Sequence, residues 1–337
     1  MNRGVKFGGG WGGALVLAAC SSAAWAQPDA SGIEFVTVGA VNNPAYAGPD
    51  RNNVATGRGS VGYEYRIGKY ELTTGQWAEF YNTFYGRVAN LDLPWQWGAY
   101  DSGQATNRFR VRTPQAAMQP VSGPWWRSAA MFCNWLHNDK RSDLSAIANG
   151  AYDISTFGYV GSTFTDQVAH NPDAKYWIPT SDEWIKAAFY DPNYGGAGVG
   201  GWWWRSPAGT NDILVQGPPG QGQTNAGFDL PGHAEYQIPL GAYPDVRSPW
   251  GCFDMSGATS EFTETVQVVS GINYRELMGS YWSGANSSSD AIYRIAADFP
   301  HFPSTFNGFR IAAAVPSPGV SSLILAAAGA VCARRRR

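Results

Sequence analysis

The residues best suited to chemistry in this chain are its four cysteines and four histidines. Cys20 and Cys332 lie in the terminal segments, which leaves Cys133 and Cys252 in the body of the chain. Their neighbours are mainly apolar, so we expect two buried thiols instead of a disulfide. The histidines are His137, His170, His233 and His301. Because they lack the spacing of metal ligands, each is expected to lie at the surface or to form hydrogen bonds.

Three helices are predicted to position the surrounding residues. The first begins near Thr73 or Thr74, and its aromatic residues recur on one face through Phe84. The second runs from about Pro124 to His137. The third begins with a capping box at residues 180–183 and must end before Pro192. These short helices leave most of the chain to strands and loops.

Short apolar runs predict strands between these helices and after them. The expected strands cover residues 35–38, 63–67, 238–240, 281–282, 292–295 and 308–311. Residues 194–235 are rich in glycine, proline, asparagine and tryptophan and show no periodicity. The pattern predicts one mixed α/β (α+β) domain with long irregular segments.

Five motifs in a fixed order give the chain a family resemblance. They are Arg66–Thr73, Pro120–Val121 with Ala129–Leu136, Ile178–Trp184, Gly251–Gly257 and Asn307–Arg310. In order and spacing the chain resembles the formylglycine-generating enzyme (sulfatase-modifying factor) family, from about Glu34 to Ala313. The resemblance implies an irregular, C-type-lectin-like fold with little regular secondary structure.

The resemblance also implies an activity that the sequence argues against. The family enzyme oxidises a sulfatase cysteine to formylglycine and binds copper through two cysteines. Gly284 stands at the first of these positions, and Ser289 or Asp290 stands at the second. None of them offers the soft sulfur that Cu(I) prefers, so copper is not expected. We predict a non-catalytic member, with an oxidoreductase of the family as the alternative.

A second family feature is a calcium site. Glu261 matches a family ligand, whereas Ala258 replaces the expected asparagine. Asn225 resembles the start of the other family calcium loop, and Asp229 could assist it. Since calcium takes six to eight oxygen ligands and backbone carbonyls could supply some of them, calcium binding stays open. A hydrogen-bonded turn carboxylate is the alternative role for Glu261.

Two clusters of aromatic residues are candidates for a binding face. They comprise Trp95, Trp97, Trp202, Trp203, Trp204 and Arg205. Tryptophan and arginine often anchor interfaces, so the expected partner is a polysaccharide or a surface protein. The alternative is that these side chains only pack the loops together. A net charge of −2 gives no electrostatic reason to expect nucleic acid as a partner.

Both ends of the chain carry export signals. Residues 1–26 have the layout of a signal peptide cut after Ala26, although Cys20 also fits a lipid-attachment box. Residues 315–337 resemble a PEP-CTERM sorting tail, with an apolar run and four terminal arginines, but Ser317 replaces the usual glutamate. We expect residues 27–314 to form the exported domain. Its tail would associate transiently with the membrane until a sorting protease releases the domain at the cell surface or in the matrix.

Overall fold

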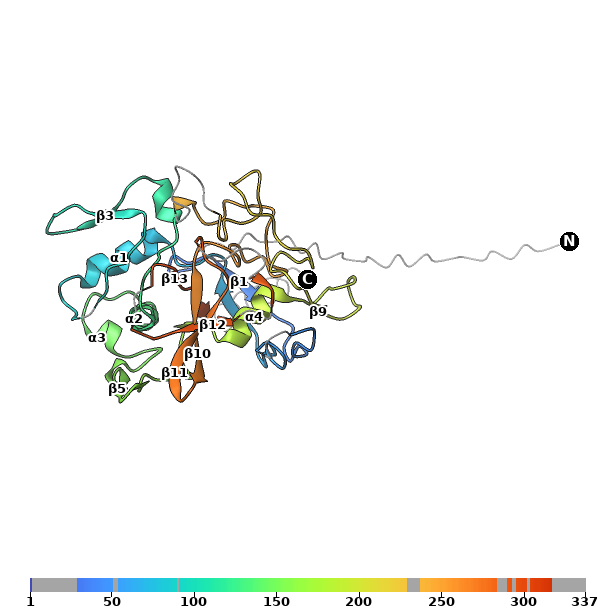
Figure 1. The fold of residues 1–337 in the computed structure, drawn as a ribbon, viewed down its shortest axis with the longest axis horizontal. Coiled ribbons are helices and arrows are strands. Elements are labelled where there is room, and N and C mark those ends of the chain that lie inside the picture. Colours follow the sequence, from blue (N-terminus) through green and yellow to red (C-terminus); the bar gives the residue numbers. More distant parts are fainter. Residues whose placement is uncertain are drawn as a thin grey trace.

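The computed structural model describes Met1 and residues 29–50, 54–89, 91–228, 237–283, 290–292, 295–301 and 304–316. The helices in these residues are α1 (Thr74–Phe84), α2 (Trp126–His137), α3 (Ser145–Ala148) and α4 (Ser181–Phe189), with short 3₁₀ turns η1 (Gln115–Met118) and η2 (Ile154–Thr156). Long irregular segments join them (Figure 1). The predicted mixed α/β fold with little regular secondary structure is confirmed.

The first sheet joins the two ends of the domain. It contains β1 (Phe35–Val38), β2 (Tyr65–Gly68), β14 (Ala312–Ala313) and β7 (Tyr176–Trp177), in the order β1-β2-β14-β7. Neighbouring strands are antiparallel, and Ala312 lies between Ile67 of β2 and Trp177 of β7. The last strand of the domain therefore occupies the interior of a sheet whose other strands all precede residue 178.

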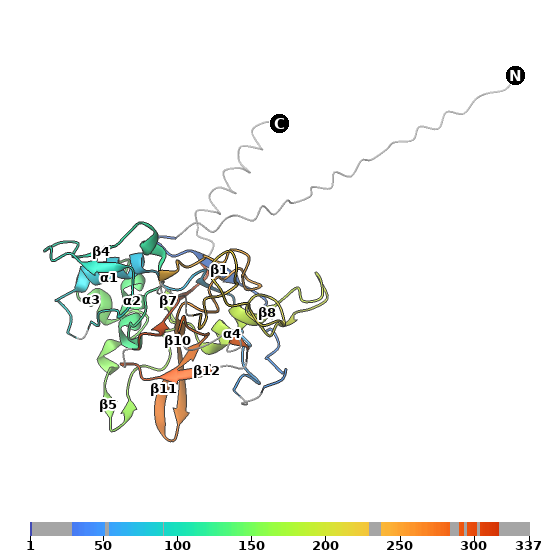
Figure 2. The ribbon, with the colours of Figure 1, turned by 45° about the horizontal axis from the view of Figure 1, so that its top comes forward.

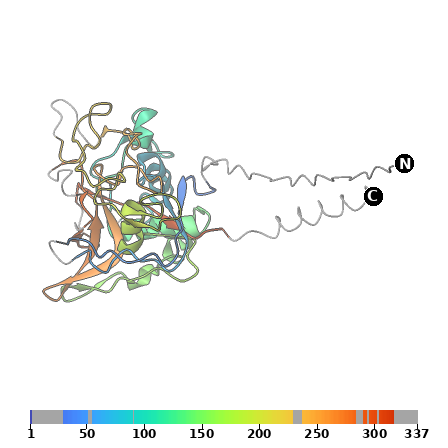
Figure 3. The same cartoon turned by 90° about the vertical axis from the view of Figure 1, so that its right-hand side faces the viewer.

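The second sheet is built on a long hairpin. It contains β10 (Ser260–Val269), β11 (Ile272–Met278), β12 (Ile295–Asp298) and β13 (Asn307–Gly308), in the order β12-β11-β10-β13. Ser270 and Gly271 connect β10 to β11 with φ angles of 53° and 80°, as a tight hairpin turn requires. The hairpin projects from the body beside β5 (Tyr159–Val160) (Figure 2). In the side view, β1 and the β10–β11 hairpin lie at opposite edges (Figure 3).

Three further hairpins shape the loops. They pair β3 (Ala99–Asp101) with β4 (Phe109–Val111), β5 with β6 (Thr163–Phe164), and β8 (Tyr190–Asp191) with β9 (Trp202–Trp203). Each is antiparallel and only two or three residues long on each side. They fix the ends of long loops without forming an extended sheet.

Local hydrogen bonds explain two helix starts. Thr73 caps α1 by accepting from the Gln76 N–H at 3.2 Å, while the Gln76 side chain accepts from the Thr73 N–H at 3.0 Å. Thr180 and Glu183 form the same reciprocal pair at α4, at 3.0 and 2.7 Å. Such a pair satisfies two backbone donors that a helix start leaves exposed. The predicted starts of both helices are confirmed.

The core between the helices and the sheets is strongly aromatic. Trp77 and Phe80 of α1 pack against Phe132 of α2, with ring centroids 5.9 and 5.3 Å away, respectively. Phe309 contacts the same group from the C-terminal segment, at 5.9 Å from Trp77. Stacked and edge-on pairs of this kind add about 0.5–1.5 kcal/mol each beyond their burial. They hold α1 and α2 against the C-terminal segment.

Several predicted boundaries were wrong. Helix α2 begins at Trp126, after an extended Trp125, and does not include Pro124. Residues 238–240 and 281–282 lie in turns and irregular backbone, and the expected strand at 308–311 is interrupted between β13 and β14. The β10–β11 hairpin was not predicted. Its residues 265–274 alternate and contain a Ser-Gly turn, which is a usable hairpin signal.

The predicted signal peptide and sorting tail fall on residues outside those that the structure describes, apart from Met1 and residues 315–316. Within the described residues, no helix is long and apolar enough to cross a membrane.

Candidate functional site

The two cysteines of the domain are buried thiols. Cys133 lies in α2 and Cys252 in the loop before β10, and neither is exposed or part of a disulfide. Burial raises the pKa of both thiols, and that of Cys133 lies well above the usual value. Because the thiolate is the form that attacks or binds a metal, neither group is prepared for redox chemistry. The predicted pair of buried thiols is confirmed.

Asp290, which aligns near a family cysteine, belongs to a buried polar cluster. Its Oδ1 accepts from the Ser280 N–H at 2.7 Å, and its Oδ2 accepts from the hydroxyls of Ser280 and Ser256 at 2.8 and 2.5 Å. These oxygen groups do not fit Cu(I), which prefers sulfur. The other two positions, Gly284 and Ser289, lie outside the described residues, and neither residue contains sulfur.

A buried ion pair links the second sheet to the C-terminal segment. Glu261 of β10 accepts from Nε and Nη2 of Arg310 at 2.5 and 2.6 Å, and from Nε1 of Trp184 at 2.9 Å. All three side chains are almost completely buried. Burial alone would lower the pKa of Arg310, but the Glu261 charge raises it. The guanidinium therefore stays charged, and its hydrogen bonds to Glu261 offset the cost of burying it.

Further contacts make this ion pair a junction of the fold. Arg310 also donates to the carbonyls of Gly68 and Phe253, at 3.0 and 3.2 Å. Glu71 lies nearby, where burial and the Glu261 charge raise its pKa well above the usual value. Thr259 donates its hydroxyl to Glu71 at 2.5 Å. We call Glu71, Trp184, Glu261 and Arg310 the buried charge centre.

The predicted calcium ligands have other hydrogen-bonding partners. Both oxygens of Glu261 accept from Arg310, and Oδ1 of Asn225 accepts from the Ala258 N–H at 2.9 Å. Asp229 lies outside the described residues. The rest of the chain, as far as it is described, contains no group of three acidic, thiol or imidazole side chains that could hold a metal. Calcium binding stays a prediction, and at Glu261 it would have to displace a guanidinium.

The histidines in the described residues lie apart from one another, and His233 falls outside these residues. His170 stacks on Trp177 with ring centroids 4.5 Å apart, and its Nδ1 lies 2.9 Å from the Glu264 carboxylate. Burial lowers the pKa of His170, but the hydrogen bond and charge of Glu264 outweigh this effect and raise it. His137 accepts from the Lys175 N–H at 3.2 Å. Both form structural hydrogen bonds.

The three consecutive tryptophans divide between surface and core. Trp202 is 49% exposed, whereas Trp203 is 4% exposed and packs edge-on against Tyr190 at 5.0 Å. Trp204 donates its Nε1–H to Asp191 at 3.1 Å. Together with Arg205 they line a cavity of about 380 Å³, which we call the β9 cavity. Trp203 is thus mainly a core residue, and Trp202 is the exposed one.

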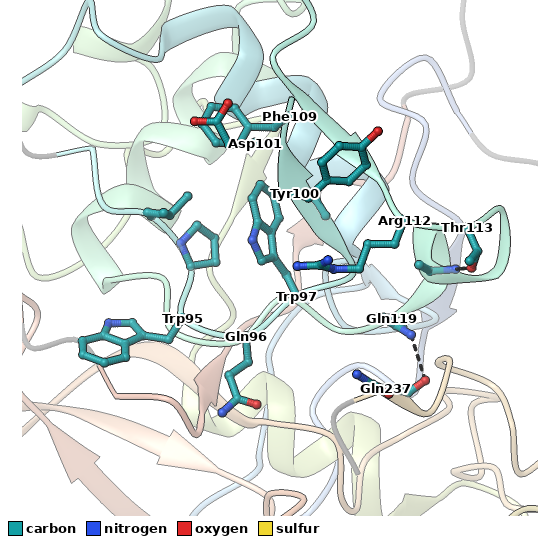
Figure 4. A pocket seen from close by; sticks show the side chains of 14 residues that line it. Trp95, Gln96, Trp97, Tyr100, Asp101, Phe109, Arg112, Thr113, Gln119 and Gln237 are labelled. Carbon is teal, nitrogen blue, oxygen red and sulfur yellow. Dashed lines mark hydrogen bonds between the residues drawn. The ribbon is translucent and has the colours of Figure 1, made fainter. Parts of the chain in front are cut away.

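The other aromatic pair lines a larger cavity of about 570 Å³, which we call the Trp95 cavity. Its lining includes Trp95, Trp97, Tyr100, Arg112, Gln119 and Gln237 (Figure 4). Trp95 is 64% exposed, and Tyr100 is 41% exposed. Sequence reasoning found the two tryptophans but missed Arg112 and Tyr100, which come from the unpredicted β3–β4 hairpin and the residue after it. The alternation of Phe109, Arg110 and Val111 was the available signal.

The two tryptophan clusters do not form one surface. The β3–β4 hairpin of the Trp95 cavity and β9 of the other cavity lie on opposite sides of the molecule (Figure 1). The predicted set of binding-face residues therefore belongs to two separate sites, each with its own aromatic groups and arginine.

Three solved structures are similar to this chain over most of its length. The crystal structure of CarF is 16% identical over 84% of this chain and 99% of that chain, with a TM-score of 0.49. Treponema denticola variable protein 1 is 16% identical over 84% and 95% of the two chains, with a TM-score of 0.47. PvdO from Pseudomonas aeruginosa is 14% identical over 84% and 92%, with a TM-score of 0.43.

No curated protein sequence matches the chain. Residues 21–315, however, match the family model described as "Sulfatase-modifying factor enzyme 1-like domain". The match includes all five motifs and nearly every described element. It confirms the family that the sequence resemblance indicated. The chain therefore belongs to the family of proteins with a sulfatase-modifying factor enzyme 1-like domain.

Proposed function

We propose that this protein is an exported, non-catalytic member of its family that acts as a binding module at the cell surface or in the matrix. The observation that carries the proposal is that the cysteine thiols of the domain are inaccessible. Cys133 and Cys252 are completely buried, with raised pKa values. The chain has glycine, serine or aspartate where the family resemblance places a copper-binding cysteine pair. A domain without an accessible thiolate pair cannot hold Cu(I) in the family manner.

Two surface features support a binding role. The Trp95 and β9 cavities both open beside exposed tryptophans, and each has an arginine in its lining. Large exposed aromatic side chains in a hollow are typical of ligand and partner sites. Trp95 and Trp202 are 64% and 49% exposed, so packing of the core does not account for these two side chains.

The export part of the proposal rests on the sequence ends. Residues 1–26 supply a signal-peptide layout, and residues 315–337 supply a tail with a short apolar run and terminal arginines. A membrane sorting protease is the proposed partner of that tail. The intact mass of the exported protein should then lack residues 1–26 and those after about Pro318. A mature product that retains Arg337 contradicts the sorting role.

The catalytic question has a direct test. The full chain is incubated with Cu(I), oxygen and a sulfatase-type cysteine peptide, and the peptide is analysed by mass spectrometry. We expect no aldehyde above a control with Cu(I) alone, while a family enzyme that retains its cysteine pair serves as the positive control. Conversion by this chain above the copper control would overturn the non-catalytic proposal and favour the oxidoreductase alternative.

A further inference from the structure

We propose that the Trp95 cavity binds a uronic acid unit of an acidic polysaccharide, with Arg112 holding its carboxylate. This inference rests on the proposed function as a binding module, and it names the ligand class and the site. The β9 cavity is not part of it. Three features of the Trp95 cavity carry the argument: its aromatic walls, the rigidity of those walls and the charge between them.

The aromatic walls can stack on a sugar ring. The side chains of Trp95 and Tyr100 are largely exposed, and Trp97 lies between them in the lining (Figure 4). A pyranose ring has an apolar face of C–H groups that packs against an indole, while its hydroxyls stay at the edge. Exposed indoles in a hollow lose apolar contact with water when such a face covers them. A cavity of about 570 Å³ has room for one or two such rings.

Trp97 is held in place before any ligand arrives. Its ring packs against Phe109 and Tyr81, with centroids 5.9 and 6.1 Å away. The backbone of Gln96 exchanges two hydrogen bonds with Ser122, at 3.0 and 2.8 Å. A wall that is already ordered costs less conformational entropy on binding. This favours a site formed in advance over a loop that must first be organised.

Gly123, which packs against the backbone of Trp95, tolerates little substitution. Gly123 has a φ of 104°, and a Cβ added to it would lie 2.7 Å from the Trp95 backbone nitrogen. A larger residue would collide with the backbone that carries the indole, and its φ would be strained as well. The close contact between Gly123 and the Trp95 backbone therefore holds Trp95 at the surface. An exposed indole does not itself stabilise the fold.

The charge in the cavity comes from Arg112. Its side chain runs toward Trp97, so that the guanidinium ends among the lining residues (Figure 4), and it makes no hydrogen bond or ion pair with any residue that the structure describes. Asp101 also lines the cavity, but Arg108 binds its carboxylate at 2.7–2.9 Å. The Arg108 charge offsets that of Asp101 and leaves Arg112 as the cation available to a ligand.

A guanidinium suits a carboxylate because it can donate two parallel hydrogen bonds to it. A uronic acid carries this carboxylate on the same ring whose C–H face can stack on an indole. Gln119 donates from Nε2 to the Gln237 carbonyl at 2.9 Å, and this contact closes the far side of the cavity. The remaining amide atoms of Gln119 can exchange hydrogen bonds with sugar hydroxyls.

Calorimetric titration of the full chain with a tetragalacturonate tests the site. A neutral tetrasaccharide of the same linkage and a sulfated one are the matched ligands. We expect the uronate to bind, and Arg112→Gln to weaken it at least tenfold, as loss of a charged hydrogen bond implies. Trp95→Ala should weaken the uronate as well. Arg110→Gln is the control because it removes the same charge from β4 outside the cavity, and it should change the affinity less than twofold.

Each of the other outcomes overturns the inference. No uronate binding by folded protein would remove the site, and equal losses in Arg110→Gln and Arg112→Gln would show only diffuse charge attraction. Tighter binding of the neutral or sulfated ligand would remove the carboxylate assignment. The two proposals fail separately, because aldehyde formation refutes the non-catalytic module, whereas absent uronate binding refutes only this ligand.

Discussion

The buried charge centre and the Trp95 cavity place the same residue types, arginine and tryptophan, in opposite surroundings. Arg310 lies inside the protein, where Glu261 and two carbonyls accept from its guanidinium and Trp184 donates to its partner. Arg112 is exposed beside the half-buried Trp97 (Figure 4), with no ion pair among the described residues. A desolvated arginine needs a compensating charge, whereas a solvated one can stay available to a ligand. The surroundings of an arginine therefore indicate whether it stabilises the fold or is available to a ligand.

The strongest test of this comparison is removal of the negative charge at the buried charge centre. Glu261→Gln leaves Arg310 buried without its partner and should lower the free energy of unfolding by about 3–5 kcal/mol. Urea denaturation followed by tryptophan fluorescence measures the change. The matched variant Asp101→Asn breaks the exposed pair with Arg108 and should leave the urea midpoint nearly unchanged. Equal losses in the two variants would remove the distinction between the regions.

The next effect depends on pH. Burial raises the pKa of Asp92, beside the Trp95 cavity, and of Asp254, beside Arg310, to about 6. Because the folded pKa of each carboxyl lies above its unfolded value near 3.8, the protonated carboxyl stabilises the folded state at low pH. This stabilisation is fully present below pH 3.8 and is lost as the pH rises through 6. Each shift is worth up to about 3 kcal/mol.

Asp92→Asn should therefore gain stability relative to the native chain as pH rises from 4 to 7. Asp254→Asn should behave in the same way. Denaturant titrations at several pH values measure these differences, and a difference that does not change with pH would contradict the raised pKa values. Burial raises the pKa of both carboxyls. The two variants therefore measure the effect of desolvation, whereas Glu261→Gln measures the loss of an ion pair.

A smaller effect is expected from the tryptophans of the two regions. Trp184→Phe keeps an aromatic ring but removes the hydrogen bond to the Glu261 carboxylate, which should cost about 1.5–3 kcal/mol. Trp95→Phe removes no side-chain hydrogen bond among the described residues and should change stability by less than about 0.5 kcal/mol. Chemical denaturation of both variants in parallel provides the measurement. A large loss in Trp95→Phe would mean that this indole stabilises the fold.

The smallest expected effect is that of Arg112→Gln on folding. The side chain is exposed and unpaired among the described residues, so the melting temperature should stay within about 2 °C of the native chain. Differential scanning fluorimetry checks this. A clear drop would show that Arg112 stabilises the loop that carries it, and a structural role would then replace the recognition role.

The sequence predicted the parts of the fold that depend on neighbours along the chain. The starts of α1 and α4 follow from Thr73 with Gln76 and from Thr180 with Glu183, and these pairs are only three residues apart. The family motifs predicted the irregular fold as a whole. The missed β10–β11 hairpin also had a local signal in Ser270 and Gly271, so that omission was not forced by the sequence.

The sites were harder to predict because their members are distant in sequence. Glu261 and Arg310 are far apart along the chain, and no periodicity shows that their side chains meet inside the protein. The same limitation placed both tryptophan clusters on one face, although they lie on opposite sides. Burial likewise separates Trp203 from Trp202, because adjacent residues of β9 point to opposite faces of the strand.

The position of β14 has a consequence for how the protein matures. This strand fills the gap between β2 and β7, so the first sheet cannot close before residue 313 is available. Pairings between distant segments form slowly because a long loop must close first. The ribosome will therefore have synthesised almost the whole domain before the first sheet can form completely. Deletion of β14 alone should therefore leave β2 and β7 without the strand that joins them, and the first sheet unfinished.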